Sequence, residues 1–327
     1  MLLTGGAGFI GSHLATALLG AGVSLSIVDN LDDFYSPAWK KANQEEVCAA
    51  GAYQFIEADI SDVDVLRRVF MRVNPEVVVH LAARAGVRPS IDRPGLYERV
   101  NVRGTLNLLE LSREFDLAKF IFGSSSSVYG DSSQVPFCED RVELRPISPY
   151  AATKLAGEAL AFTYAYLYGI RTLCLRFFTV YGPRQRPDLA IHKFTALIEA
   201  GKPVPLYGDG TSGRDYTYID DIVAGVMASL EYEPPVIAGA QYEVLNLGNS
   251  QPVKLNELLD LLEDTTGKKA IREYRPAQPG DVRLTWADIS KSSRILGYKP
   301  RTALQEGLER FVAWYRAAGE GRRLTCI

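Results

Sequence analysis

The chain has 327 residues, with 36 Lys and Arg against 39 Asp and Glu, so its formal net charge is −3. This near balance provides neither the basic surface of a nucleic-acid-binding protein nor a polybasic membrane patch. The hydrophobic content of 47% is too high for a disordered chain, and the length predicts two domains that each bury a core.

The four cysteines are scattered and form no Cys-x-x-Cys pair. This spacing excludes a zinc ribbon or a disulfide framework and favours reduced thiols in a cytoplasmic protein. Since His80 and His192 form no ligand set with the cysteines, we expect no bound metal. The first 28 residues carry no charged side chain. Glycines interrupt this stretch and no basic segment precedes it, so we expect a soluble protein without signal peptide or membrane anchor.

The first half of the chain alternates short apolar strands with amphipathic helices. In chain order we expect helix 11–22, strand 24–28, strand 53–57, helix 62–73, strand 76–80, helix 96–115, strand 119–123, helix 148–168 and strand 171–177. The strands are continuous runs of Val, Ile and Phe, which is typical of a parallel sheet covered on both faces. The fold class is therefore α/β, with a Rossmann-type doubly wound parallel sheet.

After residue 177, Pro and Gly become frequent and the alternation of strands and helices loosens. In this half we expect helices 190–200, 219–230, 255–264 and 304–316, and a strand 243–247 that returns to the main sheet. We therefore expect residues 1–177, with 216–247 returning, to form the Rossmann domain. Residues 178–327 would mainly form a smaller mixed α/β substrate domain.

A glycine pattern, Gly5-x-x-Gly8-x-x-Gly11, opens the first helix. Such glycines allow a tight turn, close approach to a pyrophosphate and close packing of the helix on the strand. The N–H groups at the helix start then face the phosphates. Asp29 ends the next strand, 18 residues after Gly11. An acid there binds a ribose 2′-hydroxyl and disfavours a 2′-phosphate, so the sequence predicts NAD rather than NADP as the cofactor.

Ser148-Pro149 predicts the start of a helix on which Tyr150 and Lys154 lie four residues apart, on one face. A nearby ammonium favours the phenolate, so this pair could remove a hydroxyl proton while a hydride leaves the same carbon. Taken alone, Tyr and Lys at this spacing are more often an ordinary helix surface. The strand before this helix runs into the serines 124–127, which places hydroxyl groups at its carboxyl end, where ligands bind in open α/β sheets.

Together these features give the chain a resemblance to the extended short-chain dehydrogenases/reductases, in the NAD-dependent nucleotide-sugar epimerase/dehydratase group. The resemblance covers nearly the whole length. It is carried by TGGAGFIGSHL (4–14), DN (29–30), ADI (58–60), HLAA (80–83), NV (101–102), SSSSVYG (124–130), YAATK (150–154), RFFTVYGPR (176–184), GRDYTYIDD (213–221) and PGDV (279–282).

The resemblance implies a role for each matching position. For the cofactor site it implies Gly5, Gly8, Phe9, Ile10, Gly11, Asp29, Asn30, Asp59, Ile60, Leu81, Ala82, Ala83 and Asn101. It implies that Tyr150 is the base, that Lys154 binds the nicotinamide ribose and that Ser125 holds the sugar O4. It further implies that Arg214 reaches the nucleotide diphosphate and that Asp281 binds the nucleotide ribose.

Members of this group share oxidation at C4 of the sugar and differ in the steps that follow. Dehydratases and UDP-glucuronate decarboxylases resemble one another in carrying a Glu just before the V-Y-G of the serine segment. Here that position is Ser127, with no carboxylate. This favours simple 4-epimerisation through a transient 4-keto sugar.

The segments 29–35 and 85–88 resemble the UDP-glucuronate 4-epimerase branch, as does part of 182–188. A C6 carboxylate needs hydrogen-bond donors. Ser126, Ser127 and Thr179 are hydroxyl candidates, and Arg88 and Arg186 are charged alternatives that could equally be solvated or bind diphosphate. We therefore expect conversion of UDP-glucuronate to UDP-galacturonate, with UDP-glucose/UDP-galactose 4-epimerisation as the alternative. Decarboxylation, dehydration and a catalytically silent NAD-binding module are further alternatives.

Helices 96–115 and 148–168 carry apolar residues around much of their circumference. Both could simply be sandwiched between the sheet and the second domain. The family resemblance implies instead a homodimer formed through a four-helix bundle.

Overall fold

The centre of the protein is an eight-stranded sheet with the order β10-β11-β6-β5-β4-β1-β2-β3. The structure is a computed structural model and describes residues 1–140 and 143–318. All neighbouring strands pair in parallel except β10, which is antiparallel to β11. The strands are β1 (Leu2–Thr4), β2 (Ser26–Asp29), β3 (Gln54–Glu57), β4 (Val77–His80), β5 (Lys119–Ser125), β6 (Arg171–Phe177), β10 (Val236–Ile237) and β11 (Ala240–Leu247).

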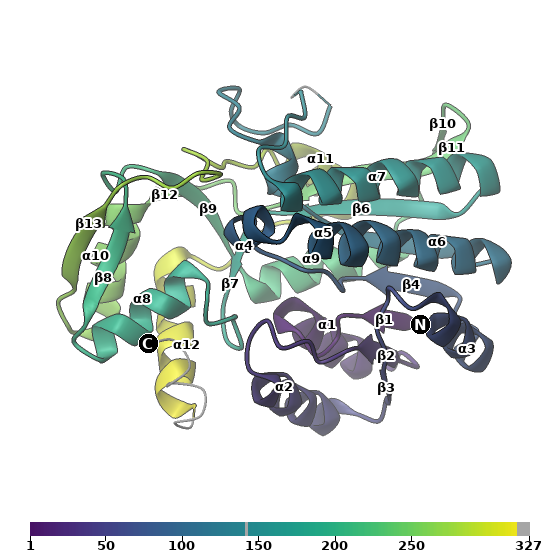
Figure 1. Cartoon of the computed structure of the whole chain (residues 1–327), viewed down its shortest axis with the longest axis horizontal. Coiled ribbons are helices and arrows are strands. Elements are labelled where there is room, and N and C mark those ends of the chain that lie inside the picture. Colours follow the sequence, from purple (N-terminus) through teal and green to yellow (C-terminus); the bar gives the residue numbers. More distant parts are fainter. Residues whose placement is uncertain (141–142, 319–327) are drawn as a thin grey trace.

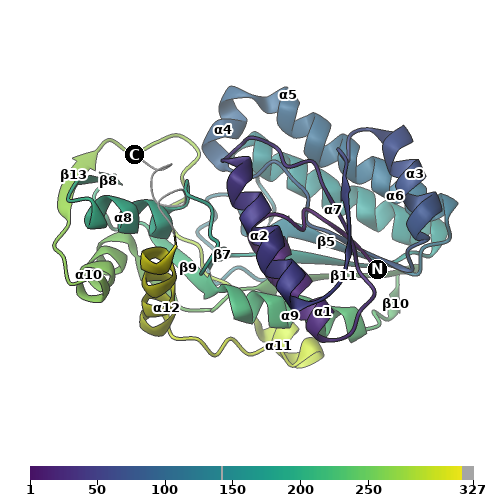
Figure 2. The same cartoon turned by 90° about the horizontal axis from the view of Figure 1, so that it is seen from below.

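Helices cover both faces of this sheet, which explains the continuous apolar runs in the strands. Successive strand residues point to opposite faces. Leu3 and Ile121 therefore join one apolar core and Leu2 and Phe120 the other, and all four are fully buried. Figure 2 shows α6 and α7 on one side of the sheet and α1 and α9 on the other. The Rossmann-type α/β fold predicted from the sequence is confirmed.

Along the chain, the helices of this part connect the strands of the main sheet, and they pack against its two faces (Figure 1). They are α1 (Phe9–Gly20), α2 (Pro37–Ala50), α3 (Val63–Val73), α4 (Val87–Asp92), α5 (Pro94–Tyr97), α6 (Gly104–Glu114), α7 (Pro149–Tyr168) and α9 (Ile219–Glu231). Helix α2 was not predicted, because only Trp39, Lys40, Asn43 and Val47 of its side chains are buried and only two of these are apolar.

Most of the remaining elements gather beyond the carboxyl ends of the parallel strands, at the left of Figure 1. Helix α11 (Ser290–Leu296) is different, since it packs against α9 and against β11 of the main sheet. A three-stranded sheet has the order β12-β9-β7, and β13 pairs with β8 in a second small sheet. The elements are β7 (Thr179–Tyr181), α8 (Ala190–Glu199), β8 (Pro203–Tyr207), β9 (Gly213–Tyr218), β12 (Pro252–Lys254), α10 (Leu255–Thr266), β13 (Ile271–Arg275), α11 (Ser290–Leu296) and α12 (Leu304–Ala317).

The predicted helix 96–115 needs a correction. A π-helical segment, Glu98–Arg103, separates α5 from α6. Its Asn101 is buried and uses its side chain outside the helix. Nδ2 donates to the Arg84 carbonyl and to Thr153 Oγ1, each at 3.0 Å, and Oδ1 accepts the Arg84 N–H at 2.7 Å. We attribute the wider turn to these long-range bonds, which a sequence pattern does not reveal; such segments are frequent at functional sites.

Within residues 1–140 and 143–318, no helix combines the length and apolar character needed to cross a membrane. Cys48, Cys138 and Cys174 are free thiols, and Cys326 lies outside the described residues.

Candidate active site

A cavity of about 890 Å³ lies where the carboxyl ends of the parallel strands meet the second group of elements. Nearly all of the site residues predicted from the sequence line it. From the cofactor set these are Gly5, Gly8, Phe9, Ile10, Gly11, Asp29, Asn30, Asp59, Ile60, Leu81, Ala82, Ala83, Tyr150 and Lys154, and from the substrate set Arg88, Ser125, Ser126, Ser127, Thr179, Arg186, Arg214 and Asp281. Asn101 is the exception, since it lies behind the cavity and holds the backbone of Arg84.

The glycine turn between β1 and α1 is a cradle that side chains would fill. A Cβ on Gly5 would lie 2.6 Å from the backbone N of Ala82, and one on Gly11 would lie 2.1 Å from the carbonyl oxygen of Gly5. Gly8 is the N-cap of α1 and has no side-chain cap hydrogen bond. The first N–H groups of α1 therefore have no side-chain acceptor and present a positive helix end, which suits a pyrophosphate.

Asp29, at the end of β2, lies beside this turn with its carboxylate at the cavity wall. Its Oδ2 accepts the Ala7 N–H at 3.1 Å, its Oδ1 accepts the Leu31 N–H at 2.9 Å, and Lys40 Nζ of α2 lies 3.9 Å from Oδ1. Farther along, Asn30 donates to Asp59 Oδ2 at 3.0 Å. Two acidic side chains thus follow the glycine turn along one wall, where they could accept hydrogen bonds from hydroxyl groups.

Helix α7 brings Tyr150 and Lys154 to the cavity. Its predicted cap is confirmed, because the Ser148 hydroxyl accepts the Ala151 N–H at 3.2 Å. The Lys154 ammonium is buried and donates to the Gly123 carbonyl at 2.7 Å. Burial lowers its pKa to about 8. The cation of Lys154 therefore points to the end of β5.

Tyr150 is partly buried at the cavity wall, and burial raises the pKa of its phenol. The Ser125 hydroxyl and the Arg186 guanidinium lower it. The sequence pointed to Lys154 as the cation beside the phenol, whereas in the structure Arg186 supplies the positive charge that acts on it.

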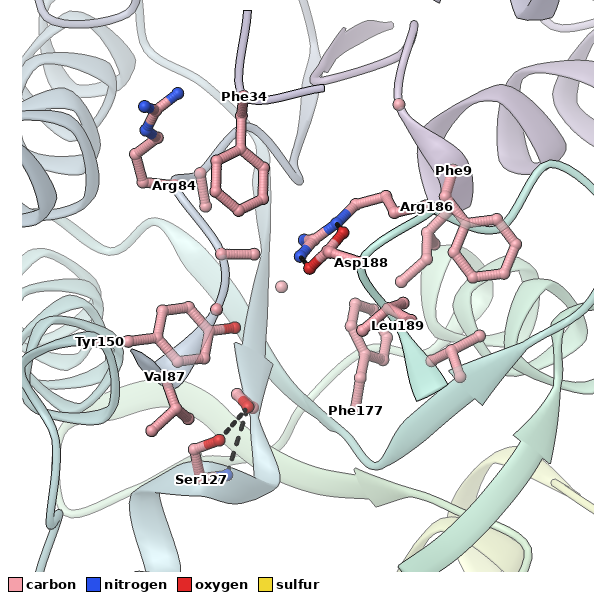
Figure 3. Close-up of a pocket in the computed structure, with 18 of the residues that line it drawn as sticks. Phe9, Phe34, Arg84, Val87, Ser127, Tyr150, Phe177, Arg186, Asp188 and Leu189 are labelled. Carbon is pink, nitrogen blue, oxygen red and sulfur yellow. Dashed lines mark hydrogen bonds and ion pairs between the residues drawn. The ribbon is translucent and has the colours of Figure 1, made fainter. Parts of the chain in front are cut away.

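The serine segment lies opposite Tyr150 (Figure 3). Ser125 ends β5 and caps the following 3₁₀ turn, Ser126–Tyr129. Its hydroxyl accepts the Ser127 N–H at 3.2 Å and donates to Ser127 Oγ at 3.1 Å. The Ser125 hydroxyl therefore lies between the phenol and Ser127, where it could hold an oxygen that exchanges a proton with Tyr150.

A cluster that the sequence did not predict closes the other side of the cavity. The Phe34 ring lies between two guanidinium groups, 5.1 Å from that of Arg84 and 5.0 Å from that of Arg186. Arg84 pairs with Asp32, and Arg186 pairs with Asp188 through Nε at 2.9 Å and Nη2 at 2.6 Å (Figure 3). The sequence singled out Arg186 and the segments 29–35 and 182–188 separately. It did not predict that they meet, because the contacts join three loops that are distant in the chain.

The two arginines that the sequence could not distinguish lie in different surroundings. The Arg186 side chain is 15% exposed and acts on Tyr150, whereas the Arg88 side chain is 43% exposed. Arg88 pairs with Asp281 at 2.6 Å and lies over the Tyr207 ring at 4.5 Å. Arg186 is therefore the more enclosed of the two cations and the one that acts on Tyr150.

Comparison with known proteins agrees with this geometry. Residues 2–311 match the family described as GDP-mannose 4,6 dehydratase. A UDP-glucuronate 4-epimerase of Thermodesulfobacterium geofontis is 44% identical over 314 residues, which cover 96% of this chain and 95% of the relative. The crystal structure of UDP-glucuronic acid 4-epimerase from Bacillus cereus with UDP-glucuronic acid and NAD has a TM-score of 0.89 and 38% identity, covering 97% of this chain and 98% of that one. UDP-glucose 4-epimerase from Thermotoga maritima with UDP-glucose has a TM-score of 0.88 and 36% identity over the same shares.

The glycine turn provides a matched pair of variants. Gly11→Ala forces a Cβ into the Gly5 carbonyl and should strongly lower the free energy of unfolding. At Gly8, a Cβ would lie 3.3 Å from the Gly5 oxygen and project toward the cavity, so Gly8→Ala should fold but bind a dinucleotide weakly. Urea denaturation and fluorescence titration with NAD measure the two effects. Unchanged NAD affinity in Gly8→Ala would contradict the assignment of this turn.

Proposed function

This chain belongs to the extended short-chain dehydrogenase/reductase family of nucleotide-sugar epimerases and dehydratases, and we propose that it interconverts UDP-glucuronate and UDP-galacturonate with NAD as cofactor. The observation that carries this proposal is the combination of groups around Tyr150. A hydroxyl from Ser125 and the largely enclosed cation of Arg186 act on the phenol, and each of the aspartates that line the cavity is bound to another protein group.

The residues present fit NAD. The glycine cradle and the start of α1 would hold the pyrophosphate, and Asp29 would accept hydrogen bonds from a ribose and repel a 2′-phosphate. Lys154 would hold the second ribose, with Asp59 and Leu81–Ala83 along the wall. When bound, NAD supplies the reversible removal of a hydride from C4 of the sugar.

The chain supplies the proton transfer and the positioning. Tyr150 takes the proton of the 4-hydroxyl as the 4-keto sugar forms. It returns the proton after the sugar ring has turned its other face toward the cofactor. Ser125 holds the 4-oxygen through its hydroxyl. Ser125 and the positive charge of Arg186 favour the phenolate, and together they partly oppose burial, which raises the Tyr150 pKa.

Elimination of water is expected to need a further carboxyl group as acid or base beside the sugar, and among the described residues no carboxylate without a partner lines the cavity. The carboxylates that line the cavity each have partners: Asp29 accepts two backbone N–H groups, Asp32 pairs with Arg84, Asp59 accepts from Ser61 and Asn30, Asp188 pairs with Arg186, and Asp281 pairs with Arg88. This supports epimerisation over dehydration.

Arg186 is the residue that we assign to the C6 carboxylate of the substrate. A buried carboxylate requires charge-assisted donors, and Arg186 is the enclosed guanidinium near Tyr150. Its two bonds to Asp188 use Nε and Nη2, so a second carboxylate would approach Nη1. Thr179, Ser126 and Ser127 add neutral hydroxyl donors, and Arg214 and Asp281 are assigned to the nucleotide diphosphate and its ribose.

We assign residues 1–177, together with 216–247, to the cofactor-binding domain, and 178–327 mainly to the substrate domain. The position of β11 beside β6 in the main sheet supports this division, as far as the described residues reach. The free thiols of Cys48, Cys138 and Cys174 support a cytoplasmic location.

A substrate assay tests the proposed reaction. The purified protein should convert UDP-glucuronate to UDP-galacturonate, identified by NMR of the product, and should not turn over UDP-glucose. Tyr150→Phe should lower kcat by roughly 10²- to 10⁴-fold while NAD binding is retained. Preferred turnover of UDP-glucose would support the neutral-sugar alternative, and formation of a UDP-pentose or a 4-keto-6-deoxy sugar would overturn the proposal. Bound NAD without any turnover would indicate a catalytically silent module.

Two arginine variants test the carboxylate assignment. Arg186→Met should weaken UDP-glucuronate binding by about 10- to 100-fold, because a charge-assisted hydrogen bond is lost, while UDP-glucose binding changes little. Arg88→Met is the matched control and should affect both ligands alike, since Arg88 pairs with Asp281 instead. Isothermal titration calorimetry measures the affinity of each variant for UDP-glucuronate and for UDP-glucose. Selective loss of UDP-glucuronate binding in Arg88→Met would reverse the assignment.

A homodimer through α6 and α7 is the quaternary structure that we propose. On α7, Phe162, Tyr166, Leu167 and Tyr168 are 40%, 55%, 58% and 49% exposed, which is a large apolar surface for a free helix. Light scattering should give twice the chain mass for the unmodified protein and the chain mass for Leu167→Glu. Met71→Glu, on α3, is the control and should leave the dimer intact. A monomeric unmodified protein would refute this proposal.

A further inference from the structure

A buried ion pair lies one helical turn beyond Lys154, and no step described so far uses it. Glu158 of α7 and Arg176 of β6 have side chains only 4% and 3% exposed. Arg176 binds both carboxylate oxygens, through Nε to Oε1 at 2.8 Å and Nη2 to Oε2 at 2.7 Å. Burying two charges is costly, so a pair in this position calls for an explanation beyond stability.

The partners of this pair hold the carboxylate in a fixed place. The Ser124 hydroxyl donates to Glu158 Oε1 at 2.5 Å. On the other side, Arg176 Nη1 donates to the Tyr129 hydroxyl at 2.9 Å, and its guanidinium lies 4.8 Å from the centre of the Tyr129 ring. Tyr129 in turn donates to Asn246 Oδ1 at 2.8 Å. The Glu158 carboxyl group is thus held from β5 and β6 at once.

A nearby carboxylate stabilises the buried ammonium group of Lys154. The Lys154 side chain is buried, its ammonium donates to the Gly123 carbonyl, and the face of the Phe122 ring lies 4.9 Å from Nζ. Burial lowers the pKa of Lys154 to about 8, and the negative charge of Glu158 opposes that effect. Since Lys154 and Glu158 are four residues apart in α7, they lie on one face of the helix. The same helix face therefore carries the base, the cation and its counter-charge.

Other groups around Lys154 cannot replace this charge at neutral pH. Burial lowers the pKa of His80 to about 3 and raises those of Cys174 and Tyr242, so all three are neutral. The ionisable groups that interact electrostatically with Lys154 are Glu158 of α7, His80 of β4 and Cys174 of β6. Arg176 of β6 and Tyr242 of β11 contact Glu158, and Tyr150 precedes Lys154 by one turn of α7. Among these described residues, Glu158 is the one carboxylate, and it raises the pKa of Lys154.

We propose that Glu158, held by Arg176 and Ser124, is a positioning residue that keeps Lys154 in its ammonium form at neutral pH. This inference rests on the proposed function, in which Lys154 holds the ribose of the cofactor as a cation. It also connects two parts of the site, because Ser124, which binds Glu158, is adjacent to Ser125 at the end of β5.

The direct test is an NMR titration of Lys154 in the NAD-loaded protein with ¹³Cε-labelled lysine, the signal being assigned by its loss in Lys154→Arg. In Glu158→Gln, the Lys154 pKa should fall by about one to two units. The alkaline limb of the kcat profile should move to lower pH by a similar amount. Glu158→Asp keeps the charge and should restore most of both shifts.

Glu158→Gln leaves Arg176 buried without its carboxylate, so this variant could fail to fold. The double variant Glu158→Gln/Arg176→Met removes both charges and avoids an isolated buried cation. Because Glu158, and not Arg176, acts on the pKa of Lys154, the double variant should still show the downward shift. An unchanged Lys154 pKa in the folded double variant would overturn the proposal. Since the NMR titration does not depend on turnover, this outcome is distinct from failure of the proposed reaction.

Discussion

The hydrogen bond from the Lys154 ammonium to the Gly123 carbonyl is the contact on which the geometry of the site depends. It fixes α7 to the carboxyl end of β5, and so fixes Tyr150 of the helix relative to Ser125 of the strand. Both elements have strong local reasons to be where they are. Ser148 caps α7, and β5 lies at the centre of the sheet between β4 and β6. The reacting groups are therefore mounted on rigid elements.

The cavity is rich in charge, and its charges are paired. Loops from β2, β4 and β7 meet around Phe34, where two guanidinium groups lie on one aromatic ring and each binds an aspartate. Beneath α7, the same principle is repeated by Glu158 and Arg176. A site in which the carboxylates are already bound favours reversible oxidation at one carbon, and provides little for elimination of water. In this chain, the pairing of the carboxylates, as well as the identity of the residues, therefore limits the available chemistry.

Local patterns predicted the parts of the site that depend on neighbours in the chain. The glycine turn, Asp29 at the end of β2 and the cap of α7 each follow from a few adjacent residues, and the structure places them as expected. The roles assigned to these residues toward NAD and the sugar remain predictions. The Rossmann sheet was also predictable, because runs of apolar residues identify strands that are buried on both faces.

Contacts between segments that are distant in the chain could not be predicted from the sequence. Nothing local distinguished Arg186 from Arg88; burial beside Tyr150 did. Asn101 was expected at the cavity wall, whereas its bonds to Arg84 and Thr153 place it behind the wall and accompany a π-helical turn. The pairing of Glu158 with Arg176 required knowing that α7 packs against β6.

The central claim is that this site oxidises and reduces the same carbon without other bond cleavage. Incubation with UDP-glucuronate carrying deuterium at C4 tests it most directly. The account predicts UDP-galacturonate that retains deuterium at C4, with no loss of the label to solvent and no release of CO₂, as measured by mass spectrometry and NMR. Loss of deuterium to solvent, or a labelled UDP-pentose as the product, would contradict it.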